Sequence, residues 1–128
     1  MKLLLDTHAF LWFVLDDPKL SATARQVIES GANEVCISPA SFWEIAIKVS
    51  LGRYRLNAAF EAFWTAAIQQ NDVTVLPIEV GHVALLVSMP FHHRDPFDRL
   101  LIAQAMAEQI PLVSVDPRLD AYGVSRRW

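Results

Sequence analysis

The pattern of apolar and polar positions predicts short buried strands separated by helices. Lys2–Leu5 contains three consecutive leucines, which cannot all lie on one face, so this run indicates a strand that is buried on both sides. Glu34–Ser38, Val73–Leu76 and Ile110–Val115 are similar short runs and predict three further strands. Tyr122–Val124 is a candidate for a short edge strand.

Helices are predicted between these strands, because apolar residues recur there at helical spacing and turn-forming residues end each segment. We expect Ser21 and Asn57 to be N-caps, and Asp95 followed by Pro96 to begin the last helix. The predicted helices are Ala9–Leu15, Ala22–Ser30, Pro39 to Gly52, Ala58–Gln70, Glu79–Ser88 and Asp95 to Met106. Alternating strands and helices predict one α/β domain over residues 1–128, built around a mainly parallel sheet.

Acidic residues stand at the ends of two predicted strands and near the starts of two predicted helices. Asp6 and Asp116 directly follow the first and the fourth strand. The carboxyl ends of parallel strands meet at one edge of a sheet, and the following helices begin at that edge. Glu44, Asp95 and Asp98 are therefore expected to converge there with the two acids that follow strands.

Each of these acids also has an ordinary structural interpretation. Asp6 and Asp95 are favoured N-cap residues, and Asp98 in a first turn suits the helix dipole. Glu44 could lie on a solvated helix face, although its neighbours Trp43 and Ile45 are apolar.

If the acids do converge, their carboxylates repel one another and their pKa values rise. A hard divalent cation such as Mg²⁺ or Mn²⁺ removes this conflict, since it prefers carboxylate and water ligands. Such an ion lowers the pKa of a bound water and stabilises charge on a phosphate, so no nucleophilic side chain is needed. The sequence agrees, because it contains no clear Ser-His-Asp or Cys-His set and no glycine-rich phosphate loop.

Charge and composition narrow the class of protein. The net charge is −3, from 14 acidic and 11 basic residues, but without the five acids of the predicted site the basic residues are in excess. An acidic site in a mildly basic surface is typical of a metal-dependent phosphodiesterase rather than of a passive DNA-binding module. With 53% hydrophobic residues and a mean hydropathy of +0.27, the chain is expected to use some apolar surface against another protein.

The sequence also predicts a cytoplasmic location. No apolar run approaches the roughly 20 residues of a membrane span, and the short apolar start does not form a signal peptide. Cys36 is the single cysteine, which agrees with a reducing compartment, and its apolar neighbours predict an inert core thiol.

Two loops carry basic and aromatic side chains. Arg53–Arg55 could contact phosphates and a base, or could be an ordinary surface turn. His92 and His93, followed by Arg94, are predicted to form a solvated or RNA-facing loop. Zinc is disfavoured, because no Cys or further His stands at ligand spacing.

Four segments together resemble the acidic motifs of PIN-domain proteins, specifically the VapC-type ribonuclease toxins of bacterial type II toxin–antitoxin pairs. In chain order they are Leu4–His8, Ser41–Ile45, Asp95–Ala105 and Leu112–Asp116. Each motif is weak by itself, but all four occur in order over nearly the whole chain. The resemblance implies a three-layer α/β/α PIN-like fold. It also implies Mg²⁺- or Mn²⁺-dependent endonucleolytic cleavage of RNA, for example at a tRNA or rRNA site, as well as a homodimer and inhibition by a cognate VapB-like antitoxin.

The resemblance also implies roles for individual side chains. Asp6 and Asp98 would be direct metal ligands, and Glu44 and Asp116 would complete the acidic pocket. The accessory residues would be Asp95 as a further acid, Thr7 and Ser114 as hydrogen-bonding supports, and Arg99 and His8 as contacts to substrate phosphate or antitoxin.

Two other classes of protein are compatible with parts of this pattern. A catalytically inactive PIN-like scaffold or RNA-binding protein has no reason to retain mutually repelling carboxylates. A flavodoxin-like or receiver domain that binds one Mg²⁺ needs a lysine near its end, whereas no lysine follows Lys48.

Overall fold

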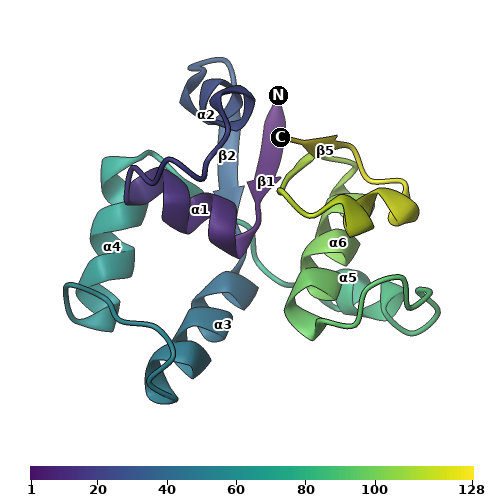
Figure 1. The fold of residues 1–128 in the computed structure, drawn as a ribbon. Coiled ribbons are helices and arrows are strands. Elements are labelled where there is room, and N and C mark those ends of the chain that lie inside the picture. The colour runs from purple at the N-terminus through teal and green to yellow at the C-terminus, as the bar shows by residue number, and fades with distance from the viewer.

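The computed structural model describes all of residues 1–128, and its centre is a five-stranded parallel sheet (Figure 1). The strands lie in the order β3-β2-β1-β4-β5, and every neighbouring pair is parallel. Their bounds are β1 Lys2–Leu5, β2 Glu34–Ile37, β3 Thr74–Val75, β4 Leu112–Val113 and β5 Arg126–Arg127. The prediction of an α/β fold around a parallel sheet is confirmed.

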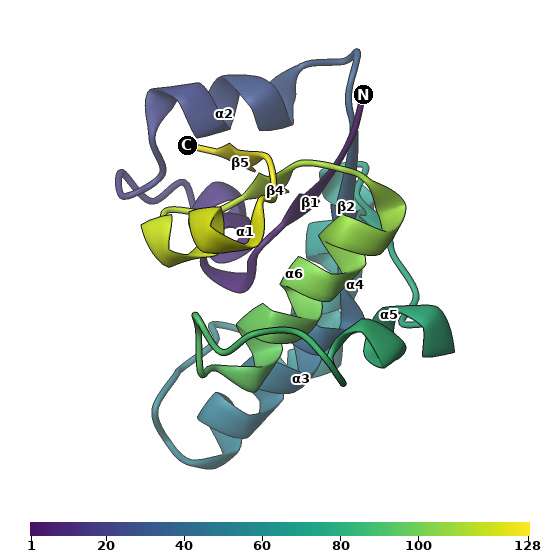
Figure 2. The same cartoon turned by 90° about the vertical axis from the view of Figure 1, so that its right-hand side faces the viewer.

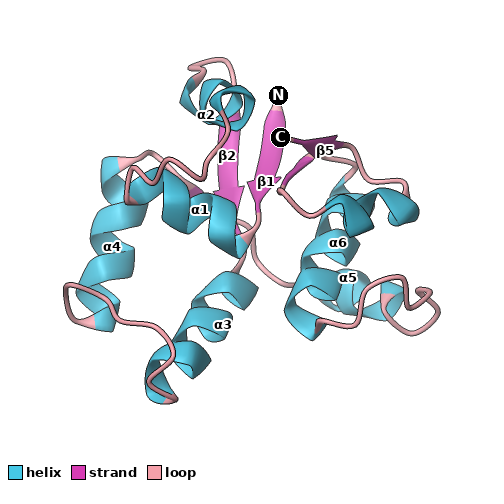
Figure 3. Ribbon diagram, viewed as in Figure 1, coloured by secondary structure: helices cyan, strands magenta, loops and turns pink.

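Helices cover both faces of this sheet (Figure 3). Along β1, Leu3 and Leu5 pack into a core cluster with residues of α1, α2 and α4, while Leu4 packs into a second cluster with residues of α6. The bounds are α1 Thr7–Val14, α2 Ala22–Glu29, α3 Pro39–Ser50, α4 Phe60–Gln70, α5 Val80–Leu85, α6 Pro96–Glu108 and the 3-10 helix η1 Pro117–Tyr122. The three consecutive leucines are therefore buried on both sides, as their sequence predicted.

Some boundaries differ from the predicted ones. α4 begins at Phe60 with Ala59 as its N-cap and without a capping side chain, so Asn57 does not cap it. The tail strand is Arg126–Arg127 rather than Tyr122–Val124, because η1 continues to Tyr122 and ends at Gly123 in the left-handed conformation, with φ of 74°.

α5 and α6 lie next to each other, and residues 86–95 form the loop between them (Figure 2). This loop carries His93 to the carboxyl edge of the sheet. None of the helices combines the length and the apolar character that a membrane span requires.

Candidate active site

A cleft of about 820 Å³ opens at the carboxyl edge of the sheet, and all five acids predicted to converge line it. They come from the end of β1, from α3, from the start of α6 and from the end of β4. The five acids are Asp6, Glu44, Asp95, Asp98 and Asp116. The parallel topology therefore brings together acids that are far apart in the chain.

Asp6 is both a helix cap and part of the cleft. Its Oδ1 accepts a hydrogen bond of 2.8 Å from the backbone N–H of Ala9, as expected of an N-cap of α1. Its side chain is also hydrogen-bonded to Ser114, which is fully buried. Burial raises the pKa of Asp6 above its ordinary value, and the hydrogen bonds from Ser114 and Ala9 oppose that effect.

Glu44 is buried against the neighbouring helix, so the alternative of a solvated face is wrong. Thr7 Oγ1 donates to Glu44 Oε1 at 2.7 Å and also lies 2.8 Å from Ser41 Oγ. Lys48 Nζ donates to Glu44 Oε2 at 3.1 Å from one helical turn further along α3. The helix instead turns Trp43 outward, with 62% of that residue exposed.

Asp95 and Asp98 begin α6. Asp95 Oδ1 accepts from the backbone N–H groups of Phe97 and Asp98, at 2.8 and 3.1 Å, so the predicted N-cap role of Asp95 is present. The pKa of Asp98 is raised to about 7, first by burial and then by the negative charges of Asp95, Asp6, Glu44 and Asp116. The carboxylates therefore lie close enough to oppose one another's ionisation.

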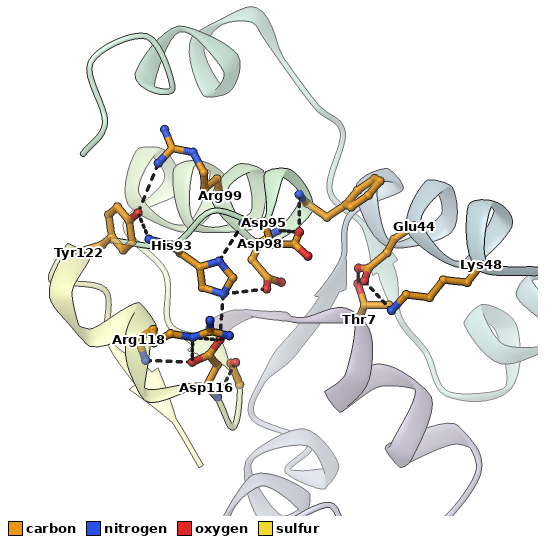
Figure 4. Close-up of polar contacts among 12 residues, drawn as sticks. Thr7, Glu44, Lys48, His93, Asp95, Asp98, Arg99, Asp116, Arg118 and Tyr122 are labelled. Carbon is orange, nitrogen blue, oxygen red and sulfur yellow. Dashed lines mark hydrogen bonds and ion pairs between the residues drawn. The ribbon is translucent and has the colours of Figure 1, made fainter. Parts of the chain in front are cut away.

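His93 lies between Asp98 and Asp116, opposite Thr7, Glu44 and Lys48 (Figure 4). Its Nε2 is 2.9 Å from Asp116 Oδ2 and 3.2 Å from Asp98 Oδ2. The prediction of a solvated or RNA-facing loop is wrong for His93, which is only 4% exposed, whereas His92 is exposed. The exposed Arg118 pairs with both oxygens of Asp116 and holds the pKa of that carboxyl well below its ordinary value.

Ser114 and His8, two of the predicted accessory residues, both lie at the site. Ser114 Oγ accepts from the backbone N–H of Asp116 at 3.1 Å, in addition to its bond with Asp6. His8 is exposed and lines the cleft, with its ring centroid 5.6 Å from that of Trp12. Both residues are therefore at the site, and their accessory roles stay predictions.

The prediction that Arg99 contacts substrate phosphate or antitoxin from the site is wrong, because its buried side chain does not line the cleft. Its guanidinium donates to the carbonyl oxygens of Pro90 and Met89, at 2.8 and 3.2 Å, and lies over the ring of Phe91. Arg99 therefore secures the loop before α6 and is not placed to contact a phosphate. The Arg53–Arg55 segment also does not line the cleft.

Sequence reasoning missed His93, Lys48 and Arg118 as members of the site. Lys48 had a usable signal, since a lysine four residues after a helical glutamate is placed to pair with it. His93 stands two residues before the N-cap of α6, which was a weaker signal.

The donor set of the cleft suits a hard divalent cation. Carboxylate oxygens dominate it, and the raised pKa of Asp98 reflects repulsion that a cation would relieve. Asp6, Glu44, Asp98 and Asp116 could hold such an ion. Ligand atoms of His93, Asp98 and Asp116 lie within 4.8 Å of one another.

Comparison with known proteins gives consistent results. Residues 3–124 match the family model described as PIN domain. The chain is 31% identical over 120 residues to ribonuclease VapC22 of Mycobacterium tuberculosis, covering 93% of this chain and 90% of that protein. The fold resembles VapBC2 from Rickettsia felis, solved bound to a promoter DNA fragment, with a TM-score of 0.68 and 13% identity over the full length of both chains. It also resembles FitAcB from Neisseria gonorrhoeae, with a TM-score of 0.63 and 17% identity over 97% of this chain and 95% of that one.

Proposed function

Because the chain belongs to the PIN domain family, we propose that it is a Mg²⁺- or Mn²⁺-dependent endoribonuclease and the toxin of a type II toxin–antitoxin pair. Its action would be to cleave RNA, for example at a tRNA or rRNA site, and so to inhibit translation. The observation that carries the proposal is the convergence of Asp6, Glu44, Asp98 and Asp116 in one polar cleft. The resemblance to a protein named as a ribonuclease supports the same activity.

In this proposal Asp6 and Asp98 hold the metal ion, and Glu44 and Asp116 complete the acidic pocket. When bound, the ion would acidify a water molecule and offset the charge that builds on the phosphate during attack. The chain contributes orientation: Ser114 and the start of α1 fix Asp6, while Thr7 fixes Glu44. These supports reduce the freedom of the carboxylates before metal and substrate arrive.

An RNA substrate is supported by the rim of the cleft. Arg94 lines it without an acidic partner and provides positive charge for a backbone phosphate, whereas Lys48 and Arg118 line it while paired with Glu44 and Asp116. Trp43 lies edge-on to Phe97 with ring centroids 5.1 Å apart, and these aromatics directly precede Glu44 and Asp98 in the sequence. An exposed aromatic ring beside a phosphodiester site can stack an unpaired base, as is common in recognition of single-stranded RNA.

We further propose a VapB-like antitoxin as partner, a homodimer as the working assembly and the cytoplasm as the location. The solved structures of similar fold include VapBC2, described as bound to a DNA fragment from its promoter. Apolar side chains are exposed around α5, with Val80 at 87% and Val87 at 89%, together with Ile78 and Val83. Such a surface is suited to contact another protein.

RNA cleavage by the purified chain tests the proposal. Wild-type protein with Mg²⁺ or Mn²⁺ is expected to cut RNA, whereas EDTA or Asp6→Asn abolishes cleavage. Asp72→Asn is the matched control, because Asp72 is exposed outside the cleft and its φ of 53° is one that Asn tolerates. Equal cleavage under all conditions would identify a contaminating nuclease and refute the assignment.

Growth inhibition provides a second test. Expression of the wild-type chain is expected to arrest growth, and Asp98→Ala is expected to remove the toxicity while the protein stays folded. A toxic Asp98→Ala variant would exclude Asp98 from the mechanism. A wild-type protein that binds Mn²⁺ and RNA without cutting would instead favour a catalytically inactive RNA-binding or scaffold protein.

A further inference from the structure

The buried ring of His93 is held at both of its nitrogen atoms, and its backbone is also fixed. The backbone N–H of Asp95 donates to His93 Nδ1 at 3.1 Å. On the other side of the ring, Nε2 lies 2.9 Å from Asp116 Oδ2. The backbone N–H of His93 donates to the hydroxyl of Tyr122 at 2.9 Å. The ring orientation is therefore set from outside the acidic cluster as well as from within it.

These contacts determine which ring nitrogen carries the proton. An N–H group that points at Nδ1 requires a lone pair there, so the single N–H of a neutral imidazole is on Nε2. Nε2–H then donates to Asp116 Oδ2, with Asp98 Oδ2 beside it at 3.2 Å. In this tautomer Nε2 has no lone pair to offer to a metal ion.

The grouping of His93, Asp98 and Asp116 therefore resembles a three-ligand metal site only by distance. A histidine ligand binds through an unprotonated nitrogen, and its other nitrogen donates to a neighbouring group. Here the relation is reversed, because Nδ1 accepts from the backbone and Nε2 faces the carboxylates.

We infer that His93 is a positioning residue that holds Asp98 and Asp116 at a fixed mutual spacing and is not itself a metal ligand. This inference rests on the metal-dependent function proposed above. Through Nε2, His93 satisfies an oxygen of Asp116 without filling a coordination position. It also links the end of β4 to the start of α6, the element that directly precedes β4 in the chain.

His82 offers a matched control within the same protein. It is also 4% exposed, its Nδ1 accepts from the backbone N–H of Glu79 at 3.0 Å, and its Nε2 lies 3.1 Å from Glu108 Oε1. It does not line the acidic cleft. Removal of either ring costs a comparable set of buried contacts, but only removal of the His93 ring disturbs acids of the site.

Mn²⁺ binding to the whole chain, measured by calorimetry, separates the two roles. His93→Ala is expected to weaken Mn²⁺ affinity by about 10- to 100-fold, as is typical when a group that orients metal ligands is lost. His93→Gln, which keeps an N–H donor, is expected to lose less, and it carries the test if the alanine variant does not fold. His82→Ala is expected to retain wild-type affinity. Wild-type affinity in both His93 variants would overturn the inference.

Pulsed electron paramagnetic resonance of the Mn²⁺-loaded protein tests ligation directly. The wild-type and His93→Gln spectra are expected to show the same nitrogen coupling to Mn²⁺. A nitrogen coupling that is present in wild type and lost in His93→Gln would show that His93 is a ligand and overturn the inference. In the metal-free protein, nitrogen-15 NMR of the ring is expected to show the Nε2–H tautomer, and the opposite tautomer would also overturn it.

These measurements do not require RNA, so they test the role of His93 separately from the proposed nuclease function. Protein that binds Mn²⁺ as described but never cuts RNA refutes the proposed function alone. Protein that cuts RNA with His93 bound to the metal refutes this inference alone, and a wild-type chain that binds no Mn²⁺ refutes both.

Discussion

Asp98→Asn is expected to stabilise the metal-free protein at pH 8, although it removes a residue of the candidate site. The pKa of Asp98 is raised from 3.8 to about 7, first by burial and then by the surrounding acids. Ionised Asp98 is therefore less favourable in the folded chain than in the unfolded chain. Asparagine has a similar shape but carries no charge, so the folded variant does not bear the free-energy cost of ionising this position.

The magnitude follows from the pKa of Asp98. At 1.36 kcal/mol per pH unit, the difference between 3.8 and about 7 corresponds to about 4 kcal/mol as an upper limit. The side chain is 28% exposed, and solvent screening reduces this value, so we expect a gain of about 2–3 kcal/mol.

The sign of the effect fixes its pH window. The folded pKa lies above the unfolded one, so the contribution of Asp98 to stability is fully present below pH 3.8 and is lost as the pH rises through about 7. The advantage of Asp98→Asn over wild type is therefore absent near pH 4, grows as the pH increases and levels off above pH 7.

Urea unfolding of both proteins in EDTA, from pH 4 to pH 8, measures this difference. Asp72→Asn is again the control and is expected to show no comparable growth with pH. Added Mg²⁺ is expected to stabilise wild type more than the variant and so to narrow the gap. A gain of equal size at pH 4 and pH 8, or a variant less stable than wild type at pH 8, would refute the reasoning.

Three further outcomes are expected. Arg99→Gln should destabilise the fold by about 2–3 kcal/mol in urea unfolding, because two carbonyl oxygens lose a charged donor; a variant as stable as wild type would contradict this role of Arg99. Arg118→Ala should raise the pKa of Asp116 toward its ordinary value, as seen in a carboxyl NMR titration. The stability that Asp116 contributes above its unfolded pKa would then be lost at a higher pH during acidification, whereas an unchanged pKa would contradict the pairing. Trp43→Ala should raise KM for RNA by about 5- to 150-fold with kcat nearly kept, by loss of base stacking of about 1–3 kcal/mol, and unaltered KM would exclude Trp43 from substrate binding.

Much of the fold could be predicted because its strong signals are local. The three leucines of β1 and the Asp95-Pro96 start of α6 appear in the structure at the predicted positions. The start of α4 was less predictable, since no capping side chain marks it. The edge strand β5 was misplaced because η1 and its left-handed Gly123 delay the return of the chain to the sheet.

The convergence of the acids was predictable for a topological reason, whereas the roles of individual side chains in loops were not. Parallel strands carry whatever follows them to one edge, so Asp6 and Asp116 had to meet near the helix starts. The positions of His93 and Arg99 are set instead by Tyr122 and by carbonyl groups of an irregular loop. Nothing in the sequence alone indicates which of two adjacent histidines turns inward.

The order of the strands has a consequence for synthesis of the protein. β1 is central, β4 pairs with it only after residue 111, and Arg126 of β5 donates to the carbonyl oxygen of Ser114 at 3.2 Å. A nascent chain therefore has Asp6 and Glu44 long before Asp116 can join them. If the chain is the nuclease proposed here, its acidic site stays incomplete beside the ribosome until β4 and Asp116 have been translated and have joined the sheet.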